Sequence, residues 1–146
     1  MDNQNEILNI GLFEDLHIFT GINESFQYQA KKPVIVFYKA ENEAETSTFH
    51  KIIQATKLKG EEIDLLKTEG DFKLNLVHIF ESNICNTAIF IGLNNTEISL
   101  PDFFQKNKAY KIKEKVFLIS DSLAKMEKNP KLKTELWNQL KTIFNL

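Results

Sequence analysis

The sequence predicts a small three-layer α/β domain, in which a mostly parallel sheet is flanked by helices. Three apolar runs support this prediction: Val34 to Tyr38, Ala88 to Ile91 and Val116 to Ile119. Each run is dominated by β-branched, aromatic or other apolar residues and lacks polar alternation, which is typical of strands buried on both faces of a parallel sheet. Segments with helical periodicity separate the runs, and this alternation is characteristic of the α/β class.

The length and composition are compatible with one folded domain. The 146 residues are 42% hydrophobic and 26% charged, which is ordinary for a globular protein and provides a core without metal or disulfides. We expect an N-terminal segment at residues 1–22, available for partner binding, and a single α/β domain at residues 23–146. We see no internal repeat and no low-complexity linker.

The first half of the chain is expected to contain two helices around the first strand. Apolar residues recur at helical spacing near the N-terminus, although Gly11 weakens this prediction; they are Ile7, Leu8, Leu12, Leu16 and Phe19. Pro33 opens the run from Val34 to Tyr38. The segment after this strand predicts a helix that ends at Gly60, with its inward positions at Phe49, Ile52, Ile53 and Ala55.

The middle of the chain continues the alternation. The stretch EEIDLLKT at residues 61–68 predicts a short strand. The next segment fits a helix through Phe72, Leu76, Ile79 and Phe80, whereas residues 74–80 alone also fit a strand. We favour the helix, because strand and helix then alternate up to the run from Ala88 to Ile91, which ends at Gly92.

The last part of the chain predicts a loop, two strands and two helices. We expect a helical turn at Asp102 and a short edge strand at Tyr110. After the run that ends at Ile119, residue 120, 121 or 122 caps a short helix. The final helix has Asn129 as its N-cap and Pro130 at its first position, a strong start signal. Its apolar stripe, with Trp137 beside it, comprises Leu132, Leu136, Leu140, Ile143 and Phe144.

Several sequence features bear on the cellular location. A single cysteine, Cys85, excludes an internal disulfide and a zinc finger. The N-terminus is acidic and polar and lacks the basic and apolar regions of a secretory signal. No apolar stretch is long enough to span a membrane. We therefore expect a cytoplasmic protein with no membrane association.

The charge is distributed unevenly along the chain. Residues 1–104 contain 8 lysines against 16 acidic residues, whereas residues 105–146 contain 10 lysines against 4 acidic residues. A basic C-terminal part could bind nucleic acid, with Phe103, Phe104 and Tyr110 as the candidates for base stacking. A solvated lysine-rich surface is the preferred interpretation, and direct contact with DNA is not expected, because the chain has no arginine for bidentate contacts to guanine.

A search for catalytic or cofactor-binding motifs finds none. There is no glycine-rich phosphate-binding motif, and the sequence has five glycines in all. His17, His50 and His78 do not have the spacing of zinc ligands. The acidic run Glu41, Glu43 and Glu45 is better explained as negative charge at a helix start than as a cation site. We therefore expect no metal and no cofactor.

Three residues remain as candidates for an enzyme active site. Asp121 follows a predicted strand, His78 lies in an apolar segment, and Cys85 could pair with a histidine as a nucleophile. Each also has a structural explanation, namely a helix cap, a histidine at the edge of the core and a small buried apolar side chain. A nucleotide- or base-handling α/β enzyme therefore stays as an alternative, and a non-catalytic protein with no catalytic residue is the main prediction.

The end of the chain resembles the C-terminal region of the psi subunit of bacterial DNA polymerase III holoenzyme. In SDSLAKMEKNPKLKTELWNQLKTIF, a strand end, a short helix and an Asn-Pro break precede a helix with a Leu-Trp pair. Earlier segments are similar in the same order: LNIGLFEDL, PVIVFYKAENEAETSTFHKIIQATKLKGEEIDLL and NICNTAIFIGL. The matching positions at the end are Ser122, Leu123, Asn129, Pro130, Leu132, Leu136 and Trp137.

The resemblance implies a fold and a function. The implied fold is like that of uracil-DNA glycosylase but non-catalytic, and the sequence has neither the Gly-Gln-Asp-Pro-type nor the His-Pro-Ser-type loop of that enzyme class. The implied function is that of an accessory subunit of the replicative polymerase, which links the clamp loader to a further subunit called chi. The implied clamp-loader contact is an apolar N-terminal peptide, which in this chain comprises Ile7, Leu8, Ile10, Leu12 and Phe13.

One feature departs from the family. Its N-terminal segments are more basic, whereas this one contains Asp2, Glu6, Glu14 and Asp15. This departure weakens the inference of a shared partner surface and of a chi-like partner. The same apolar residues could instead pack on the sheet of their own domain, and the sequence leaves the two alternatives open.

Overall fold

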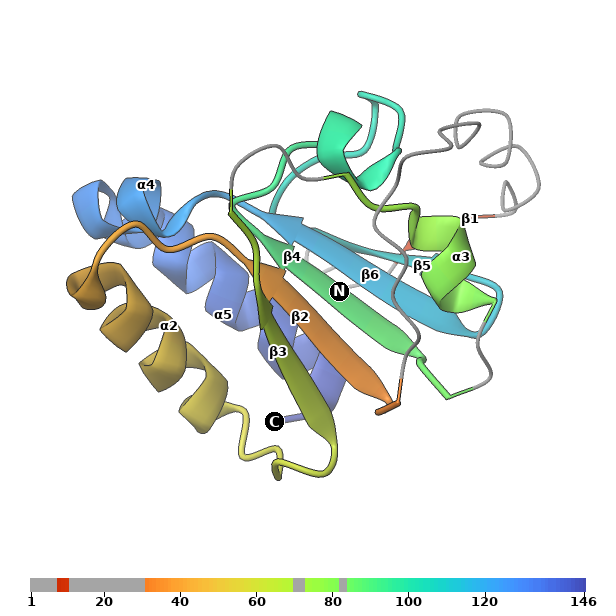
Figure 1. The fold of residues 1–146 in the computed structure, drawn as a ribbon, viewed down its shortest axis with the longest axis horizontal. Coiled ribbons are helices and arrows are strands. Elements are labelled where there is room, and N and C mark those ends of the chain that lie inside the picture. Colours follow the sequence, from red (N-terminus) through yellow and green to blue (C-terminus); the bar gives the residue numbers. More distant parts are fainter. Residues whose placement is uncertain (1–7, 11–30, 70–72, 82–83) are drawn as a thin grey trace, which may run out of the picture.

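The structure of this protein, a computed structural model, describes residues 8–10, 31–69, 73–81 and 84–146 (Figure 1). Within these residues, helices flank a six-stranded sheet whose strands lie in the order β1-β5-β6-β4-β2-β3. The strands are β1 (Leu8–Ile10), β2 (Val34–Tyr38), β3 (Ile63–Lys67), β4 (Thr87–Ile91), β5 (Lys108–Ile112) and β6 (Lys115–Ser120). The α/β class and the mostly parallel sheet predicted from the sequence are thus confirmed.

Four adjacent strands of the sheet are parallel. They lie in the order β3-β2-β4-β6. Val34 of β2 is opposite Ile63 of β3 and Thr87 of β4, and Thr87 is opposite Val116 of β6. Strand β5 is antiparallel to β6, and β1 is parallel to β5. The parallel part forms one continuous unit whose carboxyl ends meet at a single edge of the sheet.

One face of the sheet is covered by three helices, α2 (Glu43–Ala55), α4 (Leu123–Lys128) and α5 (Pro130–Phe144) (Figure 1). Asn42 begins α2, because its side chain accepts the Glu45 amide at 2.8 Å while the Glu45 carboxylate accepts the Glu41 amide at 3.1 Å. The ring of Phe49 stacks on Tyr38 at 3.8 Å between centroids. This contact ties α2 to the central strand β2.

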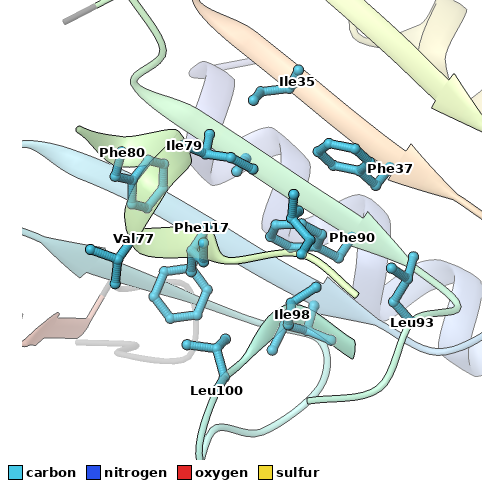
Figure 2. Close-up of a cluster of buried hydrophobic side chains, with 14 of the residues drawn as sticks. Ile35, Phe37, Val77, Ile79, Phe80, Phe90, Leu93, Ile98, Leu100 and Phe117 are labelled. Carbon is cyan, nitrogen blue, oxygen red and sulfur yellow. The ribbon is translucent and has the colours of Figure 1, made fainter. Parts of the chain in front are cut away.

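The other face is covered by α3 (Leu76–Phe80) and the 3₁₀ helix η2 (Thr96–Ile98). Figure 2 shows the side chains of this cluster converging between α3, the sheet and the segment that contains Ile98 and Leu100. Phe37 and Phe90 stack across the neighbouring strands β2 and β4 at 5.7 Å. The sheet is therefore the middle layer of three.

Most predicted elements are confirmed, with small differences at their ends. Strand β2 has the predicted bounds, β4 begins one residue earlier at Thr87, and β6 extends from Lys115 to Ser120. The helical alternative is correct for residues 76–80, where the Asn75 side chain accepts the amides of Val77 and His78. This helix has only five residues and is much shorter than its apolar spacing suggested.

The predicted helix near the N-terminus is wrong at residues 8–10. These residues form β1, whose backbone is paired with residues 110–112 of β5. Pairing with an available sheet edge outweighs the weak helical spacing of a segment that contains Gly11. Ile7, Leu12 and Phe13, with the remaining residues of the segment, lie outside the described residues.

The predicted end of α2 is also wrong. The helix ends at Ala55, five residues before Gly60, and Thr56 is its C-cap. The Thr56 hydroxyl donates to the Ile53 carbonyl at 2.6 Å, and Lys57 follows in the left-handed region with φ of 62°. Ala55, predicted to face inward, is exposed, because it lies outside the helix face formed by the buried Phe49, Ile52 and Ile53.

The closing helix α5 begins as predicted. The Asn129 side chain accepts the Lys131 amide at 3.2 Å, and Pro130 is the first helical residue. Leu136 and Leu140 are buried, whereas Trp137 is only partly buried. In the described part of the chain, no helix has both the length and the apolar character needed to cross a membrane.

Candidate functional site

The carboxyl edge between β2 and β4 is the position at which a sheet of this class usually has its ligand site. The chain leaves β2 toward α2 on one face and leaves β4 toward η2 on the other (Figure 1). In open α/β sheets, such a divergence of connections marks the crevice where ligands usually bind. Whether a ligand can bind there depends on the residues at the ends of β2 and β4.

Polar groups at this edge are engaged with one another. The Lys39 ammonium, which follows β2, forms an ion pair with the Glu97 carboxylate of η2, and the Glu97 side chain is only 15% exposed. The other Glu97 oxygen accepts the Asn94 amide at 3.0 Å, and the Lys39 amide donates to the Ile91 carbonyl at 3.1 Å. These contacts tie the ends of β2 and β4 together.

Strand β4 ends just before Gly92, where the backbone adopts a conformation that favours glycine. Its φ of +83° lies in the left-handed region, and a Cβ atom there would lie 3.5 Å from the Ser122 Cα and 3.6 Å from the Lys39 Cβ. Its amide faces the Ser120 carbonyl at 3.4 Å. The turn after β4 is thus packed between the segments that follow β2 and β6.

Asp121, the candidate acid after β6, lies within a polar network. Its carboxylate accepts a hydrogen bond from the Asn107 amide group at 3.0 Å and lies 3.7 Å from the Lys106 ammonium and 4.0 Å from that of Lys125. The cap of α4 is Ser122, whose hydroxyl oxygen accepts the Lys125 amide at 3.2 Å. Of the three capping candidates, residues 120, 121 and 122, Ser122 caps α4. The structural role predicted for Asp121 is therefore wrong.

The other two candidate catalytic residues lie elsewhere. His78 is exposed on α3, 3.9 Å from the Glu81 carboxylate. Cys85 is buried just before β4, at the amino edge of the sheet, whereas Asp121 follows β6 at the carboxyl edge. The structure does not bring these three residues together, and the catalytic arrangement considered for the enzyme alternative is wrong.

The environment of Cys85 does not favour a thiolate. Burial raises the pKa of the thiol to about 11, although a hydrogen bond with the Thr87 backbone and the charge of Lys115 both act in the opposite direction. A nucleophilic cysteine needs a lowered pKa and access to solvent. Cys85 has neither, and it packs as part of the core beneath α3.

The acidic run before and within α2 has a structural role at Glu45, which is buried and completes the helix cap. Glu41 and Glu43 are exposed. Among the described residues, no group of three or more histidine, cysteine or acidic side chains could hold a metal ion. His50 is exposed on α2 with its ring against Phe49, and His17 lies outside the described residues.

The candidate stacking residues of the lysine-rich part are mostly in the core. Tyr110 and Phe104 are buried and pack edge to face at 5.0 Å, whereas Phe103 is 60% exposed. Two of the nearby lysines have protein partners: Lys106 lies near Asp121, and Lys115 donates to the Cys85 carbonyl. The three aromatic residues therefore do not form the exposed platform that base stacking requires.

A polar pocket beside this network was not predicted from the sequence. It has a volume of about 270 Å³ and is formed where the loop before β5 faces α5. In the described part of the chain, the Asn107 Oδ1 atom is buried without a hydrogen-bond partner. The lining residues are Gln105, Lys106, Asn107, Lys108, Glu135, Asn138 and Gln139. Asn107 lies in the left-handed region with φ of 59°, a conformation that asparagine adopts more often than most residues.

Comparisons of the chain with protein-family models, with curated proteins and with solved structures found no match.

The left-handed backbone of Gly92 leads to a stability prediction. We expect Gly92→Ala to lower the free energy of unfolding by about 1–2 kcal/mol, because an L-residue is strained in the left-handed region. The matched control is Gly60→Ala, since a Cβ atom at Gly60 would meet nothing within 4 Å; we expect it to be neutral or slightly stabilising. Urea unfolding of both variants measures the difference, and equal effects would contradict this view of the turn.

The raised pKa of Cys85 leads to a second prediction. The pKa of the Cys85 thiol is about 11 in the folded state, against 9.0 for an ordinary thiol. The contribution of the protonated thiol to the free energy of unfolding is therefore fully present below pH 9. Above that pH the unfolded chain loses the proton first, so stability falls as the pH rises from 9 to 11. We expect Cys85→Ala to show a smaller fall over this range in urea unfolding.

A labelling experiment checks the same site independently. Iodoacetamide at pH 8 should modify native Cys85 far more slowly than the urea-unfolded chain. Rapid modification of the native protein would contradict a buried, protonated thiol.

Proposed function

We propose that this protein is a non-catalytic accessory subunit of a bacterial replicative DNA polymerase, similar to the psi subunit, which links the clamp loader to another component. The observation that supports the proposal is an ion pair at the carboxyl edge of the sheet, between Lys39, which follows β2, and Glu97 of η2. A sheet of this class normally binds its ligand there. A protein that uses this edge for internal contacts is better suited to binding partners through its other surfaces.

The fold is compatible with the resemblance. The family is expected to have a fold like that of uracil-DNA glycosylase, and four parallel strands with helices on both faces support this finer assignment. The segments that carry the resemblance form contiguous elements in the same order: β2, α2 and β3, then β4, then α4 and α5. The Asn129-Pro130 and Leu136-Trp137 pairs lie at the start and in the middle of one capped helix.

The N-terminal segment is the proposed contact with the clamp loader. Leu8 and Ile10 belong to β1, a three-residue strand at the edge of the sheet beyond β5. Within the described sheet β1 pairs with one strand, β5, and a short edge strand costs little to detach compared with a central one. Apolar residues in such a segment can therefore order on a partner groove.

A binding experiment tests the proposal. The full chain and a variant lacking residues 1–14 are each mixed with the purified clamp-loader subunits of the same bacterium, and complex formation is measured by biolayer interferometry. We expect the full chain to bind and the deletion variant to lose most of the affinity, because it lacks the apolar anchors at residues 7–13.

Matched substitutions control for non-specific effects of the deletion. Replacing Leu12 and Phe13 together by alanine should weaken binding at least tenfold, whereas replacing Gln4 and Asn5 by alanine should leave it nearly unchanged. Circular dichroism verifies that each variant is folded. A folded full chain that binds no clamp-loader subunit refutes the proposed function.

A further inference from the structure

A small apolar groove lies between α2 and α5 on the outer surface of the helical layer. It has a volume of about 170 Å³ and is almost entirely apolar. Helix α2 contributes Lys51, Ile52 and Ala55, and helix α5 contributes Lys133 and Trp137. The two helices run along the same face of the sheet (Figure 1).

The groove exists because of two side chains. Ala55 is exposed in the last turn of α2 and is too small to fill the space between the helices. Trp137 packs against the core only in part, so that some of its indole surface remains available. Tryptophan buries a large apolar area when it is fully packed, and partly exposed aromatic side chains are enriched where proteins bind partners.

The rim of the groove is positively charged. Lys51 on α2 and Lys133 on α5 are both exposed, and no acidic residue is among the residues that line the groove. Helix α5 also exposes Lys131 and Lys141. Such an arrangement attracts carboxylates around an apolar centre, because complementary charge favours encounter and orientation of a partner.

The size of the groove limits the occupant. An apolar cavity of about 150 Å³ in a protein accommodates benzene, whereas pockets for drug-sized ligands and cofactors are usually about 300–1,000 Å³. A volume of about 170 Å³ therefore suits one aromatic or branched aliphatic side chain better than a cofactor.

We propose that the groove between α2 and α5 binds an acidic peptide segment of a partner protein, with one aromatic side chain inserted against Trp137 and carboxylates near Lys51 and Lys133. This surface lies on the helical layer, whereas β1 lies at the edge of the sheet. The inference does not depend on the polymerase assignment. Combined with a binding N-terminal segment, it gives the protein two separate contact surfaces.

Intrinsic fluorescence provides a direct test, because Trp137 is the single tryptophan of the chain. The full chain is titrated with a synthetic peptide in which one phenylalanine is flanked by aspartates. We expect a saturable change in Trp137 emission, and binding should weaken as salt is added because the attraction is screened. A peptide with alanine in place of phenylalanine, and one with lysines in place of aspartates, should both bind at least tenfold more weakly.

Two pairs of variants locate the binding surface. Ala55→Leu fills the groove and should weaken binding at least tenfold, whereas Gln54→Leu adds the same side chain on the same helix outside the groove lining and should have little effect. The double variant Lys51→Glu with Lys133→Glu should abolish measurable binding. Lys131→Glu is the charge control, since Lys131 is exposed on α5 but does not line the groove.

Three results would overturn the proposal. The first is an emission that does not change with the acidic peptide. The second is equal binding to the wild type and to Ala55→Leu. The third comes from sedimentation: if Ala55→Leu converts a dimer into a monomer, the groove holds a second copy of the chain rather than an acidic partner.

Discussion

The complete burial of two central strands is the constraint on which the rest of the structure depends. All five residues of both β2 and β4 are buried, so that apolar side chains on both faces need cover. Burial of such side chains stabilises the fold by about 1.5–3 kcal/mol each. One face is covered by α2, α4 and α5 and the other by α3 and η2, and the connections between strands must therefore diverge at the carboxyl edge.

Ligands usually bind where connections diverge in this way, and here polar groups at the strand ends bind one another. The Lys39–Glu97 ion pair and the backbone hydrogen bonds from Lys39 to Ile91 and from Gly92 to Ser120 link the ends of β2, β4 and β6. Cys85 and His78 lie away from this edge, and Asp121 after β6 pairs with Asn107 and Lys106. Among the described residues, the strand edge at β1, the groove beside Trp137 and the polar pocket beside Asn107 are surfaces available to partners or ligands.

The fold was predictable from the sequence where burial dominates. The run from Val34 to Tyr38 is apolar without alternation, and Asn129-Pro130 is a strong helix start signal, so both were correctly assigned. The errors arose where long-range contacts decide the structure. For example, residues 8–10 pair with β5, about 100 residues away in the chain. The Lys39–Glu97 pair and the groove join residues from separate elements and have no local signature.

Hydrogen–deuterium exchange of the chain, alone and mixed with the clamp-loader subunits, tests the central claim most directly. The claim is that the protein binds its partner through the N-terminal segment and that the residues at the carboxyl edge of the sheet have a structural role. We predict that the partner protects amides within residues 1–14 and leaves residues 39–42 and 92–97 unchanged. Protection concentrated at residues 39–42 and 92–97, with none in the N-terminal segment, would contradict the account.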